Sequence, residues 1–227
     1  MKSHKILKSI TLVLLLAIGT RITYAAEPTN PKSQYILGLR YQLGDGVEKN
    51  MQKAYALYKK AAEQGYAPAQ FAMGICYENG GHGITQDGQN AAYWYRRAAL
   101  QGHTKAQLHL GNLYWFKDRG VPRNEQKAMD WWFVASVNGE SKAQLYLAHR
   151  YFQLSEQQND ETYLKKAFYW YHEAASQGEA SAQYALGVMF QMGRPVDKDL
   201  KTAVHWYKKA ASQGHKEAYK RLKELRY

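Results

Sequence analysis

The segment HEAAS at residues 172–176 is the part of the chain that comes nearest to a catalytic motif. It begins like H-E-x-x-H, in which two histidines one helical turn apart bind zinc and the glutamate acts as a base. Serine stands at position 176, where the second histidine would have to be, so we interpret His172 as an ordinary surface residue. The other histidines do not stand at metal-ligand spacings, and the sequence contains no nucleophile elbow, Walker loop or dinucleotide fingerprint. We therefore predict no catalytic residues, no metal and no cofactor.

Cys76 is the single cysteine of the sequence, so no intramolecular disulfide can form and the fold must depend on packing. We expect a small buried apolar residue here rather than a reactive thiol. The chain is also basic, with a formal net charge of +12. The simplest interpretation is a solvated, lysine-rich helix surface. An exported basic protein would in addition meet acidic proteins, anionic lipid headgroups or cell-wall polymers more readily than nucleic acid.

Residues 1–26 have the pattern of a secretory signal peptide. Lys2, Lys5 and Lys8 precede an apolar run at 10–19, and small residues offer a cleavage site near Ala25 or Ala26. A membrane span would need about 20 apolar residues, which makes it the weaker alternative, together with a retained N-terminal anchor. The compact leader is typical of a bacterium, so we predict a periplasmic or secreted protein without a stable membrane span after cleavage.

A decapeptide such as YWYRRAALQG (93–102) recurs five times along the chain. Aligned on one alanine, the copies are separated by 37, 37, 39 and 36 residues, a period that indicates a solenoid of repeated supersecondary units. A second segment, such as AQFAMGICY (69–77), precedes each copy at a similar distance. Both segments carry apolar residues at helical spacing. We therefore expect two antiparallel helices in each repeat, with the alanines that align the copies on the packed face: Ala54, Ala91, Ala128, Ala167 and Ala203.

Glycine occurs at two repeated positions. The first lies inside the first helix of four repeats, where glycine costs about 1 kcal/mol relative to alanine; this cost is best explained by the close approach of a neighbouring helix. The second follows the decapeptide and suits a helix C-cap. The fourth repeat differs, with Ala148 at the first position and a longer expected loop at 154–166. A polar helix at the C-terminus would cap the last repeat through Ala218, Leu222 and Leu225.

These segments closely resemble the Sel-one-like repeat (SLR) family, relatives of the tetratricopeptide repeats. The family pattern runs through residues 33–68, including Leu37, Gly38, Tyr41 and the Gln64-Gly65 end. The resemblance implies an all-α, right-handed superhelical solenoid of about five helix pairs and a scaffold for protein–protein contact. It implies these units: repeats at 33–68, 69–105, 106–142, 143–181 and 182–217, and a capping helix at 218–227.

By analogy with tetratricopeptide solenoids, the first helix of each pair lines a concave groove. Four of the six tryptophans share one repeat position and a fifth is adjacent to it, so we expect these five to be packing residues. Trp115 alone is out of register, and no packing role accounts for it in the sequence pattern. We therefore select it, with Phe116, as the centre of a partner-binding face. The predicted concave face comprises Trp115, Phe116, Phe152, His149, Asn112, Tyr35, Leu39, Phe71, Ile75, Tyr184, Val188 and Met192.

The leading hypothesis is an exported, non-catalytic adaptor that holds a protein or peptide partner in this groove. A narrower version, implied by the resemblance, is a periplasmic immunity or inhibitor protein that neutralises a secreted toxin. The alternative is a cell-envelope enzyme or ligand-binding protein acting on cell-wall material. Some cysteine-rich relatives are linked to β-lactam binding or hydrolysis, and the single Cys76 disfavours that activity.

Overall fold

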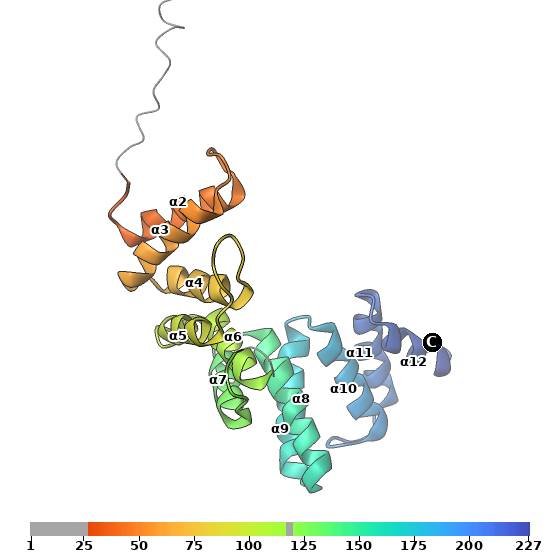
Figure 1. Cartoon of the computed structure of the whole chain (residues 1–227). Helices are drawn as coiled ribbons and strands as arrows, with labels where there is room; N and C mark the ends of the chain where they lie inside the picture. The colour runs from red at the N-terminus through yellow and green to blue at the C-terminus, as the bar shows by residue number, and fades with distance from the viewer. Residues whose placement is uncertain (1–26, 117–119) are drawn as a thin grey trace, which may run out of the picture.

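The computed structural model describes residues 27–116 and 120–227. Within these ranges the regular elements are eleven α-helices, and the all-α prediction is confirmed (Figure 1). The predicted signal peptide at 1–26 lies outside the described residues. The helices are α2 (Pro31–Leu43), α3 (Met51–Glu63), α4 (Ala67–Asn79), α5 (Gly88–Ala99), α6 (Thr104–Trp115), α7 (Glu125–Val137), α8 (Ser141–Gln158), α9 (Glu161–Ser176), α10 (Ala180–Met192), α11 (Leu200–Ser212) and α12 (Lys216–Glu224).

The second helix of each pair starts at a side-chain cap. Asn50, Asp87, Asn124, Asp160 and Asp199 each accept hydrogen bonds from backbone N–H groups in the following turn. These caps satisfy N–H donors that have no partner within the helix. In all five pairs the backbone N–H of the capping residue also donates back to the first helix, as Asn124 does to the Tyr114 carbonyl at 2.8 Å. The loop therefore fixes the two helices as an antiparallel pair.

The glycine inside the first helix admits an aromatic ring from the second helix. A Cβ atom added to Gly38 would lie 2.6 Å from the Tyr58 ring, and one added to Gly187 would lie 2.5 Å from the Tyr207 ring. No real Cβ is tolerated at such distances. The predicted close approach of helices at these glycines is confirmed, and it explains why the helix accepts a residue that destabilises it.

The second helix of each repeat ends at a glycine with left-handed backbone, such as Gly65 with φ 92°. The N–H of the next residue, Tyr66, donates to the Ala61 carbonyl at 3.1 Å, which turns the chain into the following repeat. The predicted C-cap role of these glycines is confirmed: Gly65, Gly102, Gly139, Gly178 and Gly214 all have positive φ.

In repeats 2 to 5 a buried glutamine of the first helix bonds to a carbonyl of the preceding repeat and to an exposed amide of its own repeat, a contact absent from the predictions above. Gln70 is 1% exposed, and its Nε2 donates to the Ala62 carbonyl of the preceding helix at 3.1 Å. Its Oε1 accepts from Gln101 Nε2 at 2.7 Å. Equivalent pairs join Gln64 to Gln34, Asn138 to Gln107, Gln177 to Gln144 and Gln213 to Gln183.

The expectation of a long loop at 154–166 is wrong. Helix α8 continues to Gln158 and α9 begins at Glu161. Repeats 1 and 5 end their first helix at Gly44 and Gly193, both left-handed, whereas Leu154 stands at the equivalent place in repeat 4. Helix α8 continues beyond Leu154 for another turn, until Asn159 adopts the left-handed conformation with φ 51°.

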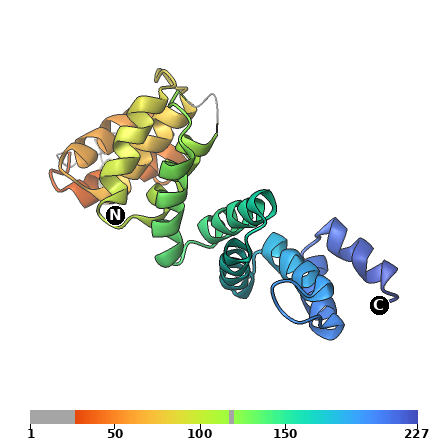
Figure 2. The ribbon, with the colours of Figure 1, turned by 90° about the horizontal axis from the view of Figure 1, so that it is seen from below.

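The helix pairs stack side by side into a curved solenoid (Figures 1 and 2). In Figure 2 the first three pairs form one group, and the direction of the stack changes where α7 passes to α8. Helix α12 packs on α11 through Ala218 and Leu222, both buried, as expected of a terminal cap. No helix in the described ranges is long and apolar enough to cross a membrane.

Candidate partner-binding surface

Trp115 ends helix α6 at the change of direction between the third and fourth repeats, and its ring packs on Trp132 of α7. The two ring centroids are 5.2 Å apart, and Trp132 in turn lies 5.4 Å from Tyr146 of α8. Trp132 is 2% exposed, and its Nε1 donates to Asn112 Oδ1 at 3.0 Å. The expectation that no packing role accounts for Trp115 is therefore wrong, because its ring extends the core outward to the surface.

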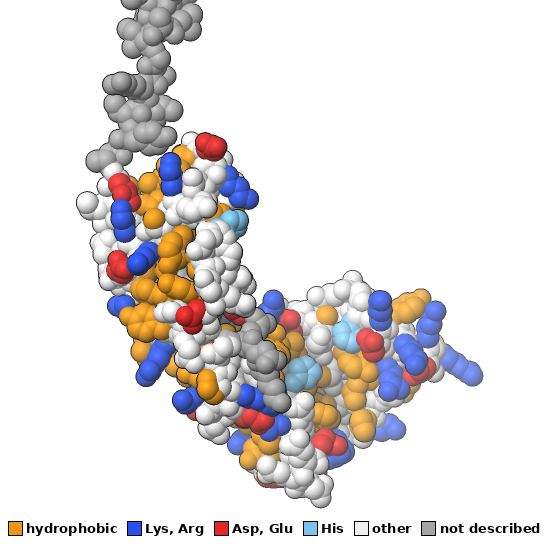
Figure 3. Space-filling view, viewed as in Figure 1, with side chains coloured by type: hydrophobic (Ala, Val, Ile, Leu, Met, Phe, Trp, Pro, Cys, Tyr) orange, Lys and Arg blue, Asp and Glu red, His pale blue; other side chains and the backbone are white. Residues whose placement is uncertain are grey.

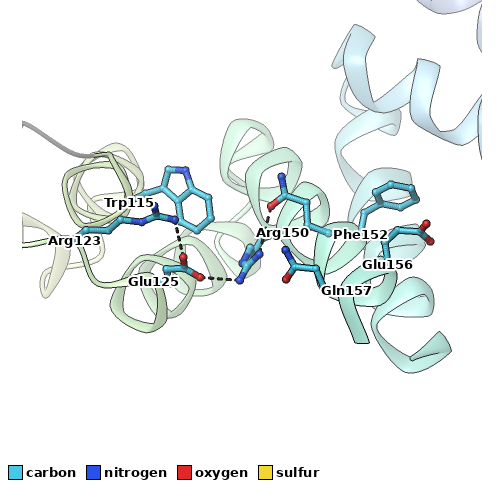
Figure 4. A pocket seen from close by; sticks show the side chains of 8 residues that line it. Trp115, Arg123, Glu125, Arg150, Phe152, Glu156 and Gln157 are labelled. Carbon is cyan, nitrogen blue, oxygen red and sulfur yellow. Dashed lines mark hydrogen bonds and ion pairs between the residues drawn. The ribbon is translucent and has the colours of Figure 1, made fainter. Parts of the chain in front are cut away.

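Two guanidinium groups hold the Trp115 ring (Figure 4). The Cζ atoms of Arg123 and Arg150 lie 4.9 Å and 5.6 Å from its centroid. One carboxylate, that of Glu125, accepts from both arginines, at 2.6 Å from Arg123 and 2.7 Å from Arg150. Cation–π attraction and the shared ion pairs together limit the ring's freedom. These contacts restrain the orientation of the Trp115 ring.

Two adjoining recesses open beside Trp115. The larger, of about 730 Å³, extends along α8, and the smaller, of about 240 Å³, lies over Trp132. Four residues of the predicted face line this pair of recesses: Trp115 lines both, Phe152 the larger, and Phe116 and His149 the smaller. Phe116 and Phe152 are 44% and 38% exposed, so two aromatic side chains remain available at the rims.

His149 forms a hydrogen bond with the hydroxyl of Tyr171, the aromatic residue of the second helix in repeat 4. Its Nδ1 lies 2.8 Å from the Tyr171 hydroxyl. One side of the ring faces solvent, while desolvation on the other side lowers the pKa of His149 below its ordinary value. Asn112 has the equivalent role toward Trp132 in repeat 3. Both residues, which the sequence predicts to touch a partner, therefore also hold the helix pair together.

Four other predicted residues gather in a separate recess of about 410 Å³ between the first two repeats. Tyr35, Leu39, Phe71 and Ile75 line it. Cys76 lies in the same wall, and burial raises the pKa of its thiol to about 11, which agrees with the inert apolar role expected of it. This recess is apolar and aromatic, without the paired charges found near Trp115.

The last three predicted residues, Tyr184, Val188 and Met192, lie on α10 of the last repeat. Tyr184 stacks on His215 at 4.7 Å and contacts the Tyr207 ring at 5.7 Å, while Val188 packs beside the last core cluster. Met192 is 65% exposed. The residues predicted for the concave face therefore fall into separate groups, at the recess near the N-terminal end, around Trp115 and in the last repeat.

Most of the polar wall of the larger recess is absent from the predicted face: Arg123, Glu125, Arg150, Glu156 and Gln157. Arg123 belongs to an inter-helix turn, where repeats 1 and 5 also carry a basic residue, Lys49 and Lys198. Glu156 and Gln157 were assigned to a loop, although the missing glycine at Leu154 was a signal that α8 continues. Figure 3 shows the recess region at the bend of the molecule, with apolar and charged side chains intermixed.

This arrangement is suited to recognition. Within the described ranges no group of three or more His, Cys, Asp and Glu residues could hold a metal ion. The Trp115 recesses instead combine a fixed indole, two aromatic rims and side-chain amides. Trp and Arg are the residue types enriched at the energetic centres of protein interfaces.

Comparisons with known proteins agree with this architecture. A family model described as Sel1 repeat matches residues 31–66, 67–103, 104–136, 141–179 and 180–215. A Sel1 repeat protein from Oxalobacter formigenes is 32% identical with a TM-score of 0.73, and the match covers 93% of this chain and 84% of that one. A protective antigen present in uropathogenic Escherichia coli strains, which displays an SLR fold, is 34% identical with a TM-score of 0.76.

Two of these similar proteins are much longer than the matched region. The match covers 86% of this chain but 41% of the Escherichia coli antigen. Chitin synthase regulatory factor 3 of Schizosaccharomyces pombe is 39% identical over 56 residues, which is 25% of this chain and 6% of that protein. The chain thus spans less than half the length of both proteins.

Proposed function

Because this chain belongs to the Sel1 repeat family, whose members are protein-interaction scaffolds, we propose that it holds a protein or peptide partner at the recesses around Trp115. The observation that carries the proposal is the fixed indole between Arg123 and Arg150. A side chain that is ordered in advance loses little conformational entropy when a partner binds.

The size and composition of the site support a peptide-like partner. The larger recess, of about 730 Å³, is within the range of small-ligand pockets and can accept one or two side chains of a partner. Phe116 and Phe152 on its rims supply exposed aromatic surface. Gln153 and Gln157, also in this region, carry amides that can bond a peptide backbone. Binding would displace water from the aromatic rims without unpairing Glu125 from its arginines.

Two finer parts of the proposal depend on the sequence. Export rests on the leader pattern at residues 1–26, which would place the scaffold in the cell envelope. The narrower role, an immunity or inhibitor protein for a secreted toxin, rests on the family resemblance alone. A toxin gene adjoining the gene for this chain would support that role, and an unrelated neighbourhood would remove it.

Site-specific photocrosslinking in cells tests the central proposal. A benzophenone amino acid replaces Phe116 in one variant and Phe152 in another, and both should yield the same crosslinked partner. The matched control places it at Tyr169, an exposed aromatic residue of a second helix at 55% exposure, where no such product is expected. Absence of a product at both recess positions, or equal yield at Tyr169, would contradict the proposal.

Affinity measurements with the partner so identified give the quantitative test. We expect Phe116→Ala with Phe152→Ala to weaken binding at least about tenfold, as is usual for aromatic anchors. The control pair Tyr93→Ala with Tyr169→Ala removes two exposed rings of the second helices and should change affinity less than about twofold. Both pairs should melt near the temperature of the unmodified protein, since all four rings are exposed.

A further inference from the structure

The positive charge of the described chain is concentrated at one end of the solenoid. Residues 1–26 contain Lys2, Lys5, Lys8 and Arg21 and no acidic residue, so the formal charge of +12 falls to +8 for residues 27–227. Residues 200–227 hold eight Lys and Arg against two Glu. This segment alone therefore carries +6, and the preceding 173 residues together carry +2.

Most of these terminal cations are exposed and are not ion-paired within the described ranges. Arg221 pairs with Glu224 at 3.1 Å. Lys208, Lys209 and Lys223 instead lie over the rings of Tyr227, Trp206 and Tyr219, at 5.4, 4.7 and 4.7 Å from the centroids. A cation over a ring keeps its full charge. Figure 3 shows the resulting cluster of Lys and Arg at the α11–α12 end.

Helix α12 directs three of its lysines away from the solenoid. Lys216, Lys220 and Lys223 are spaced i, i+4 and i+7 and share one face of the helix. The buried residues Ala218 and Leu222 lie on the opposite face, against α11. Tyr219 and Tyr227, beside the lysines, are 57% and 63% exposed. The outer face of the end helix is therefore a cationic surface with aromatic edges.

The outer face of α12 lacks two residues with which α10 receives its second helix. Aligning Ala218 with Ala182 puts Lys223 at the place of Gly187, the glycine that admits the ring of a second helix in the preceding repeat. Tyr219 stands at the place of Gln183, so α12 lacks the buried glutamine that the other first helices carry. The outer face of α12 is thus left for contact with something other than a further helix pair.

We propose that this end face of α12 docks on the anionic surface of a phospholipid bilayer. Ammonium groups on an exposed, open helix face act as point charges toward a diffuse anionic surface, whereas recognition of a discrete phosphate or carboxylate favours the planar fork of arginine. Tyrosine is enriched at the headgroup level of membranes, which suits Tyr219 and Tyr227. This site is separate from the Trp115 recesses and does not depend on the function proposed for them.

Docking through α12 would orient the scaffold. The recesses around Trp115 lie on α6, α7 and α8, several helices away from the end face (Figure 1). A molecule held at its C-terminal end would present these recesses away from the lipid surface, where a soluble partner can reach them.

Vesicle binding by the full chain tests the proposal. The probes are vesicles of phosphatidylcholine alone and vesicles with roughly one third phosphatidylglycerol, which supplies the negative surface potential. Comparing the two isolates the part of binding that depends on anionic lipid, since apolar insertion of any other segment contributes to both. We expect binding to the anionic vesicles to exceed binding to the neutral ones at least about tenfold and to fall steeply as salt is raised.

The decisive variant is Lys216→Gln, Lys220→Gln and Lys223→Gln combined. We expect it to lose most of the anionic-lipid-dependent binding, about tenfold or more, because each removed charge weakens attraction to the surface. The matched control, Lys59→Gln, Lys105→Gln and Lys142→Gln, removes the same charge from exposed lysines elsewhere and should lose less than about twofold. Circular dichroism melting establishes that both variants are folded.

Three results would overturn the proposal. One is equal binding to neutral and anionic vesicles. Another is an equal loss in the two triple variants, which would mean that net charge, and not the α12 face, drives binding. The third is tighter binding to a duplex oligonucleotide than to the anionic vesicles, abolished by the α12 variant alone, which would assign the face to nucleic acid.

Discussion

Trp115 shows how one residue can serve both the fold and the site. Its inner face contacts Trp132, 5.2 Å away, while its outer part lines both recesses. Replacing it with alanine would remove a packing partner of a buried ring, so a loss of binding in that variant could not be assigned to the partner contact. Phe116 and Phe152 are exposed and separate the two effects, which is why the binding test uses them.

His149 should make stability depend on pH. Desolvation lowers its pKa in the folded protein, so the unfolded chain takes up a proton first as pH falls. The free energy of unfolding should therefore decrease as pH drops through the unfolded value of about 6.5 and level off below the folded pKa. Urea unfolding at several pH values from 7.5 to 5 would measure this decrease.

The chain itself supplies the control for His149. Repeat 3 has Asn112 at the equivalent position, where it accepts from Trp132, so His149→Asn keeps an acceptor for Tyr171 without a titrating ring. The variant should lose part of the pH dependence, while His103, whose pKa burial also lowers, should retain its own share. An unchanged slope in His149→Asn would show that His149 is not responsible.

The residues differ in how far sequence could predict them. The glycine and aromatic positions repeat along the chain, and repetition at helical spacing reports packing. Repeat 1 carries Lys49 and Arg40 at the places of Arg123 and Arg150, so the repeat pattern alone does not indicate that these two residues meet beside a tryptophan. Their contact depends on the change of direction between α7 and α8, a tertiary property that local spacing does not specify.

Within a helix pair, the contact between the first-helix glycine and the second-helix ring is the feature whose loss should most clearly lower stability. Gly187→Ala replaces glycine with a better helix former, yet its Cβ would lie 2.5 Å from the Tyr207 ring. We expect a loss of about 1–3 kcal/mol in the free energy of unfolding, because overpacking outweighs helix propensity. Chemical denaturation measures this loss.

The fourth repeat provides the matched change. Ala148 already stands at the equivalent position, so its backbone has adapted to a Cβ. Ala148→Gly should cost about 1 kcal/mol through propensity and the small void. A stabilised Gly187→Ala protein would show that the Tyr207 ring and α10 can move apart without a loss of stability, contrary to the close contact described above.

Helix boundaries were predicted well where a stop residue is present and poorly where one is absent. Glycine C-caps ended the second helices as expected. Leu154 lacks that conformational signal, and the following polar residues, which are also good helix formers, were interpreted as a loop. Their helical propensity extends α8, and the Asp160 cap sets the start of α9. The prediction of a loop took neither into account.

The whole molecule is a linear array, so its stability should be local. Truncation after His215 removes α12 and exposes Val204, Tyr207 and Ala210, which pack in the same cluster as Leu222. Each repeat contacts mainly its neighbours, so protection from hydrogen exchange should fall in α10 and α11 and remain unchanged in α2 to α5. Exchange measured by mass spectrometry would detect the difference.

A uniform loss of protection in the truncated chain would instead mean that the solenoid unfolds as one cooperative unit. The capping role of α12, and the independence of the two ends that the proposed membrane contact requires, would then both need revision. The five-fold repeat and the cap were predictable from sequence, whereas the curvature of the array and the position of its recesses were not, because each depends on small rotations between neighbouring pairs.

The carboxylate of Glu125 forms ion pairs across the bend of the solenoid. It joins Arg123, in the turn before α7, to Arg150, on α8, and so spans the place where the stack changes direction. Its side chain is 43% exposed, within reach of dissolved ions, and salt weakens such pairs. The curvature of the solenoid would then depend on ionic strength. The width of the opening beside Trp115 would change with it, because the recesses lie at the same bend.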